Sequence, residues 1–169
     1  MKKVSHKLKH VIAALMVVVF AFAVIMVNPQ ETQAATVQKK TLAAGTKYAT
    51  ELYIYKSGKP GPVVMIVGGV HGNETAGWKA ATTAKNYKVK KGTLLVLPKA
   101  NKRAVNIKKR YVAGVGDLNR QFPKTKSGTG NSILARAIYE TIKTYKVDWL
   151  MDMHEGYDYY KKEIRSEEL

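Results

Sequence analysis

Apolar residues gather in three short runs along this chain, and each run is bounded by glycine, proline or polar residues. The runs are Val63–Val67, Thr93–Leu97 and Val147–Met153. A continuous apolar run of this length is typical of a central strand that is covered on both faces of a sheet. Residues 46–55 are rich in β-branched and aromatic types, which predicts one further strand.

Two segments between these runs show helical rather than alternating periodicity. They extend from Glu74 to about Asn86 and from about Ser132 to Tyr145, and Asn73 is suited to cap the first. Strands that alternate with helices predict an α/β fold with a mostly parallel sheet. Residues 99–131 form a long, basic, glycine-containing connection, and connections of this length are often functional.

The N-terminus has the three parts of a secretory signal peptide. A basic head is followed by an uncharged apolar run, Val11–Val27, and by small residues at Thr32–Ala35. This order predicts a signal peptide over residues 1–34, cleavage after Ala34, and a secreted or extracytoplasmic protein. The alternative is an uncleaved membrane anchor, although the run is short for a bilayer, which takes about 20 residues.

The remaining chain is interpreted as one incomplete domain with two flanking segments. Residues 35–45 are expected to be a mobile lead-in, residues 46–156 the folded domain, and residues 157–169 a charged tail. The chain has no cysteine, so its stability does not depend on disulfides.

The formal net charge of the whole chain is +17. An exported basic protein is attracted to anionic cell-wall polymers or lipid headgroups, although a solubilising basic surface explains the charge equally well. The sequence has no motif that reads nucleic acid, and export argues against that partner. A membrane is expected to contact the chain only through the signal segment.

Two histidines follow predicted strands, and one of them is accompanied by a glutamate. His71 and Glu74 follow Val63–Val67, and His154 follows Val147–Met153. Sites of α/β proteins lie beyond the carboxyl ends of the strands, so these side chains are expected to converge. Two imidazoles and one carboxylate bind zinc and leave one position open. A lone His-x-x-Glu is weak evidence, since surface histidines near glutamates are common.

Three motifs in order strengthen this prediction. They are Gly-Gly-Val-His-Gly-Asn-Glu-Thr-Ala-Gly at 68–77, Asp-Leu-Asn-Arg-Gln-Phe-Pro at 117–123 and Asp-Met-His-Glu-Gly at 152–156. From Tyr48 to Gly156 the chain resembles the zinc carboxypeptidase superfamily, and within it the succinylglutamate desuccinylase/aspartoacylase branch. The resemblance implies a three-layer α/β fold with a mixed, mostly parallel sheet of the zinc-exopeptidase type.

The resemblance also implies roles for individual residues. His71, Glu74 and His154 would be zinc ligands, and Asn119 with Arg120 would hold a substrate carboxylate. Arg110 would stabilise the oxyanion, and Asp117 would orient a zinc-bound histidine.

Each of these residues has a plainer alternative. For Asn119 and Arg120 the less favoured alternative is a turn with a surface cation, and Arg110 lies in a basic cluster that a solvated loop explains equally well. Asp152 shares a strand face with His154 and is either a partner of that ring or a structural carboxylate.

The resemblance implies a general-base glutamate on a later strand, and the sequence shows no convincing candidate for it. Glu155 directly follows His154, and neighbouring side chains on a strand point to opposite faces. The others lie in the charged segment without a strand pattern: Glu163, Glu167 and Glu168. The expectation from sequence is therefore a chain truncated before its base, lacking the C-terminal strands, with apolar surface uncovered around Val147–Met153.

Two functions remain open from the sequence. The first is a secreted zinc-dependent hydrolase of amide bonds beside a free carboxylate, either a metallocarboxypeptidase or an N-acyl amino acid deacylase, acting on a small acyl-amino acid or peptide. The second is a non-catalytic protein that binds zinc or an anionic cell-wall polymer.

Overall fold

The computed structural model describes residues 34–156. The predicted signal peptide, apart from Ala34, and the predicted charged tail lie outside the described residues. In the part that is described, no helix is both long enough and apolar enough to cross a membrane.

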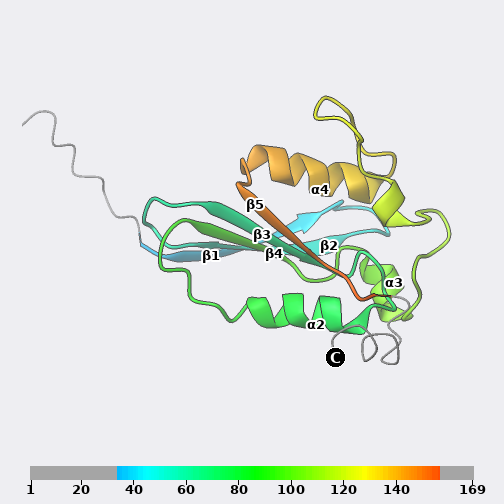
Figure 1. Cartoon of the computed structure of the whole chain (residues 1–169), viewed down its shortest axis with the longest axis horizontal. Coiled ribbons are helices and arrows are strands. Elements are labelled where there is room, and N and C mark those ends of the chain that lie inside the picture. The colour runs from blue at the N-terminus through cyan, green and yellow to red at the C-terminus, as the bar shows by residue number, and fades with distance from the viewer. Residues whose placement is uncertain (1–33, 157–169) are drawn as a thin grey trace, which may run out of the picture. The chain divides into compact units, whose positions relative to one another are not determined.

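The described residues form a mixed five-stranded sheet in the order β1-β2-β4-β3-β5 (Figure 1). The strands are β1 Thr36–Leu42, β2 Thr50–Lys56, β3 Val63–Gly68, β4 Thr93–Leu97 and β5 Trp149–Met153. β3 pairs in parallel with both β4 and β5, whereas β2 is antiparallel to β4 and β1 is antiparallel to β2. The three predicted apolar runs are therefore the parallel part of the sheet.

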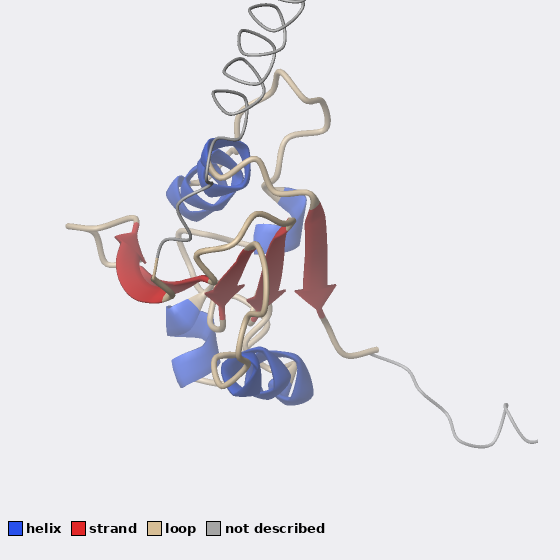
Figure 2. Cartoon of the chain, turned by 90° about the vertical axis from the view of Figure 1, so that its left-hand side faces the viewer, coloured by secondary structure: helices blue, strands red, loops and turns tan. Residues whose placement is uncertain are grey.

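Helices cover both faces of this sheet, as Figure 2 shows from the side. They are α2 Thr75–Ala84, α3 Lys102–Asn106 and α4 Ile133–Thr144, with a short 3-10 helix, η1, at Leu118–Arg120. Leu134 and Ile138 of α4 pack on one face with Leu95 and Leu97. Ala81 and Ala84 of α2 pack on the other face with Ile66 and Val96. The predicted three-layer α/β fold is confirmed.

Residues 35–45 correct one prediction. They were expected to be a mobile lead-in, yet Thr36–Leu42 pairs with β2 along its whole length. All of its residues except Leu42 are exposed, so the strand has no buried face to produce an alternating pattern. Its backbone hydrogen bonds to β2, rather than a hydrophobic face, place it in the sheet.

The start of α2 corrects a second detail. Asn73 was the predicted N-cap, but the helix begins at Thr75 and Glu74 is the N-cap. The Glu74 side chain makes no hydrogen bond to the helix backbone. Its carboxylate is engaged elsewhere, as described below.

β5 is the most exposed strand of the parallel part. Trp149, Leu150 and Met151 are 71%, 50% and 55% exposed. The expectation of uncovered apolar surface around Val147–Met153 is confirmed for these three side chains.

Candidate metal centre

The loop after β3 carries His71 and is held by close backbone contacts. Gly69 has a φ of +71°, which favours glycine, and its carbonyl accepts a hydrogen bond from the Asn101 N–H at 2.8 Å. Gly72 lies so close to α3 that an added Cβ would be 2.0 Å from the Ala104 carbonyl carbon. These contacts direct the His71 side chain to the carboxyl ends of the parallel strands, where it is buried.

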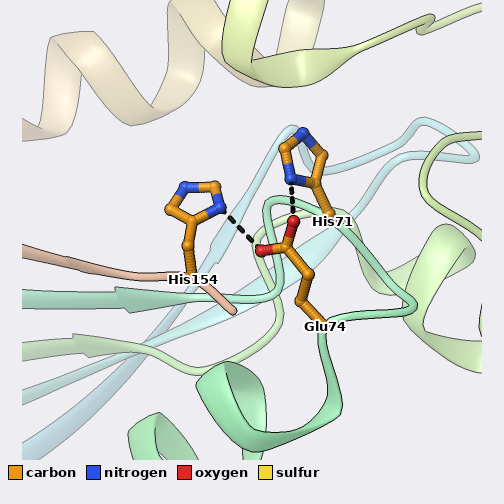
Figure 3. Close-up of side chains that lie close together, drawn as sticks. All are labelled: His71, Glu74 and His154. Atoms are coloured by element: carbon orange, nitrogen blue, oxygen red, sulfur yellow. Dashed lines mark hydrogen bonds and ion pairs between the residues drawn. The ribbon is translucent and has the colours of Figure 1, made fainter. Parts of the chain in front are cut away.

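His71, Glu74 and His154 converge on one point, as Figure 3 shows. Glu74 Oε1 lies 2.6 Å from His71 Nδ1, and Glu74 Oε2 lies 2.7 Å from His154 Nδ1. The two ring centroids are 5.0 Å apart. Residues that are far apart in sequence thus meet because β3 and β5 are neighbours in the sheet.

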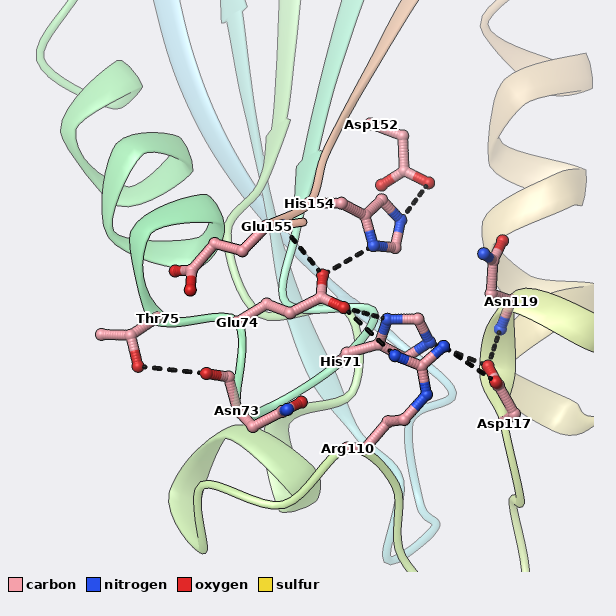
Figure 4. A network of polar contacts seen from close by, with 10 residues as sticks. All are labelled: His71, Asn73, Glu74, Thr75, Arg110, Asp117, Asn119, Asp152, His154 and Glu155. Atoms are coloured by element: carbon pink, nitrogen blue, oxygen red, sulfur yellow. Dashed lines mark hydrogen bonds and ion pairs between the residues drawn. The ribbon is translucent and has the colours of Figure 1, made fainter. Parts of the chain in front are cut away.

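The second nitrogen of each imidazole also contacts a carboxylate (Figure 4). His71 Nε2 lies 2.8 Å from Asp117 Oδ1, and His154 Nε2 lies 3.1 Å from Asp152 Oδ2. In metal sites, a carboxylate on the remote ring nitrogen fixes the ring orientation and tautomer. Asp117 therefore lies where the predicted orienting acid should be, and Asp152 takes the same place for the other ring.

Arg110 lies beside this cluster on the connection after α3. Its guanidinium donates to Glu74 Oε1 at 3.4 Å and to Asp117 Oδ2 at 3.2 Å. Arg110 is therefore not simply a solvated loop residue, because its guanidinium contacts the candidate metal centre. Its predicted oxyanion role remains a prediction.

Asn119 and Arg120 belong to η1, next to Asp117. Asp117 caps η1 through its side chain, which accepts from the Asn119 N–H at 3.0 Å. Both side chains are exposed. Both are thus accessible to a ligand, and their carboxylate-binding role remains a prediction.

Glu155 also contacts the cluster, and the sequence analysis assigned it no role there. Its backbone N–H donates to Glu74 Oε2 at 3.2 Å, and its carboxylate accepts from the Ala76 N–H at the start of α2. In Figure 4 its side chain extends toward α2 and away from the His154 ring. The only sequence signal was its position directly after His154.

The electrostatics of the cluster follow from these contacts. Burial raises the pKa of Glu74, but hydrogen bonds from His71, from the Glu155 backbone and from His154 outweigh it and lower that pKa. Burial raises the pKa of Asp117 as well, and the His71 ring, the Asn119 N–H and Arg110 lower it below its usual value. Burial lowers the pKa of His154, whereas Asp152 and Glu74 raise it to a net increase. The carboxylates are thereby kept in the ionised form that a cation requires.

The donor set of this cluster fits a zinc ion. The candidate ligand atoms of His71, Glu74 and His154 all lie within 4.8 Å of one another. A tetrahedral zinc site with bonds of about 2.1 Å places its donors roughly 3.4 Å apart, so small side-chain rotations suffice. An imidazole donates from both nitrogens only when it is doubly protonated, and each ring here lies between two carboxylates. A divalent cation would take the place of the protons on the Nδ1 atoms.

Several solved structures resemble this fold. An aspartoacylase family protein from Mesorhizobium loti has 24% identity and a TM-score of 0.58, over 76% of this chain and 42% of its own. The product-bound ectoine utilization protein EutE (DoeB) from Ruegeria pomeroyi has 22% identity and a TM-score of 0.56, over 75% and 41%. A succinylglutamate desuccinylase/aspartoacylase from Rhodobacter sphaeroides has 26% identity and a TM-score of 0.53, over 72% and 39%. This chain therefore spans about two fifths of the length of these relatives.

The fold and the His–Glu–His cluster together define an α/β domain with a candidate metal site. The sequence profile of the succinylglutamate desuccinylase/aspartoacylase catalytic domain matches residues 60–162. The chain belongs to this family, which confirms the resemblance stated from the motifs. No curated protein matches the chain significantly.

Proposed function

We propose that this chain is a zinc-dependent hydrolase of amide bonds that lie beside a free carboxylate. The observation that carries the proposal is the convergence of His71, Glu74 and His154, with an aspartate on the remote nitrogen of each ring. Membership of the desuccinylase/aspartoacylase catalytic-domain family supports the reaction class. The substrate class is an N-acyl amino acid or a short peptide.

The residues around the cluster suit this reaction. His71, Glu74 and His154 hold the zinc ion, which when bound polarises a carbonyl group and increases the acidity of water. Arg110 places a guanidinium at the rim of the cluster, where it stabilises negative charge that develops on the carbonyl oxygen. The exposed Arg120 has the planar donor fork that pairs with a carboxylate in two hydrogen bonds.

The carboxylates around the cluster favour a second candidate function, zinc binding without turnover. Among residues 34–156, those nearest the candidate ligands are already engaged: Asp117 with His71, Asp152 with His154, and Glu155 with the start of α2. A general base typically contributes ~10²–10⁴-fold to the rate, so turnover without one is slow.

Metal analysis and a hydrolysis assay on the full chain test the two candidates together. The assay uses N-acyl amino acids and peptides with a free C-terminus. One zinc per chain with hydrolysis supports the hydrolase, and one zinc per chain without hydrolysis supports the second candidate. Failure to bind zinc would overturn both.

Two variants test whether zinc binds at this cluster. We expect His71→Ala to abolish zinc binding, because it removes a buried ligand. Glu140→Gln is the matched control, since Glu140 is exposed on α4 and, among residues 34–156, pairs only with Lys143 at 2.6 Å. Zinc binding that survives in His71→Ala would place the metal elsewhere.

We further propose that the protein acts outside the cytoplasm and meets anionic wall polymers. The basic head, apolar run and small residues of segment 1–34 support export, and the net positive charge, most of which lies outside this segment, supports the polymer contact. A reporter enzyme fused to residues 1–34 should appear outside the cell. Binding to isolated wall polymer should weaken as the salt concentration rises, and salt-independent binding would contradict the electrostatic explanation.

A further inference from the structure

α2 lacks an N-terminal cap from its own N-cap residue. The first N–H groups of a helix have no partner inside the helix and need an acceptor from elsewhere. Glu74 occupies the N-cap position, but its carboxylate contacts His71 and His154 instead of the helix backbone. The residue that would cap α2 is thus committed to the candidate metal centre.

Glu155, which follows β5, supplies the missing hydrogen-bond acceptor. Its carboxylate accepts from the Ala76 N–H in the first turn of α2. A negative charge at a helix N-terminus is also favoured by the helix dipole. Meanwhile its backbone N–H donates to Glu74 Oε2, the oxygen that faces His154. One residue thereby contacts both the helix start and the ligand carboxylate.

An independent feature brings the same two segments together. Gly77 is buried in α2, and a Cβ there would lie 2.5 Å from the Met153 carbonyl oxygen. The end of β5 therefore rests directly on the backbone of α2. Glu155 follows this contact by two residues, and its carboxylate lies at the first turn of α2.

We propose that Glu155 is a positioning residue for the metal centre, which joins the end of β5 to the start of α2 and so holds Glu74 against His154. By capping α2 in place of Glu74, it leaves the Glu74 carboxylate free to serve as a ligand. When Glu155 is removed, the uncapped N–H groups of α2 compete for that carboxylate. This inference rests on the proposed metal site, and it assigns Glu155 no contact with a substrate.

Three variants of the full chain test the proposal. Glu155→Ala removes the acceptor, and Glu155→Gln retains an oxygen that accepts from Ala76. Ser132→Ala is the matched control, because Ser132 caps α4 by accepting from the Ala135 N–H at 3.2 Å and lies outside the cluster. Zinc affinity is measured by competition with a chelator, and the Ala76 amide is followed by hydrogen exchange.

We expect Glu155→Ala to weaken zinc binding at least tenfold and to speed exchange of the Ala76 amide. Glu155→Gln should restore most of the affinity, and Ser132→Ala should lower the melting temperature with unchanged affinity. Unchanged zinc affinity in Glu155→Ala would overturn the proposal, as would an equal loss in Ser132→Ala. If the parent chain binds no zinc, the proposed function fails, and unchanged Ala76 exchange would then separately refute the cap.

Discussion

Substitution of Gly77 by alanine sets two opposed effects against each other. Alanine stabilises a helix interior by about 1 kcal/mol relative to glycine. At this position, however, the new Cβ would lie 2.5 Å from the Met153 carbonyl oxygen and 3.0 Å from its carbon. Both are backbone atoms, so no flexible side chain can move aside to make room.

The clash must be relieved by moving α2 and the end of β5 apart, roughly 1 Å if normal contact is to be restored. Overpacking of this kind typically costs about 1–3 kcal/mol, so we expect a net destabilisation of about 0–2 kcal/mol. The larger effect falls on the metal centre. The same movement separates His154 from Glu74, whose Nδ1 and Oε2 atoms are 2.7 Å apart. Because metal–ligand bonds tolerate only about 0.2 Å, zinc affinity should fall at least tenfold.

Chelator competition measures the affinity, and urea unfolding of the metal-free protein measures the stability. Ala80→Gly is the matched control, since Ala80 is exposed on the same helix and its replacement costs about 1 kcal/mol of helix propensity without a clash. The control should lose stability and keep its zinc affinity. The reasoning is refuted if Gly77→Ala becomes about 1 kcal/mol more stable while zinc affinity is unchanged.

The remaining predictions concern the orienting carboxylate, the core and the exposed strand. Asp117→Ala should weaken zinc binding about 10–100-fold, because it removes the acceptor that orients the His71 ring, as measured by chelator competition, and full affinity would contradict an orienting role. Leu134→Ala should reduce the free energy of unfolding by about 2–5 kcal/mol, since this α4 side chain is almost fully buried, and a loss below 1 kcal/mol in urea unfolding would disprove its place in the core. Trp149→Lys and Leu150→Lys should change stability by less than about 0.5 kcal/mol yet reduce self-association in light scattering, because both side chains are exposed on β5; a large loss of stability would show that they are packed.

The fold could be predicted where the pattern of apolar residues in the sequence matches their burial in the structure. Val63–Val67 and Thr93–Leu97 are central strands whose apolar runs reflect cover on both faces, and the structure confirms them. Thr36–Leu42 escaped prediction because six of its seven residues face solvent, so no apolar pattern marks it. The N-cap of α2 was misplaced for a related reason, since a long-range contact decides which residue caps the helix.

The sequence alone identified the three residues that the structure brings together at the candidate metal centre. His71, Glu74 and His154 were predicted to meet because each follows a strand, and parallel strands end at one edge of a sheet. Only the tertiary structure decided what surrounds them: Asp152 on one ring, and Glu155 on the helix that begins after Glu74. The physical reason is that candidate metal ligands can be recognised from residue type and from their spacing after the strands. Orientation, in contrast, depends on hydrogen bonds and close backbone contacts between segments that are distant along the chain.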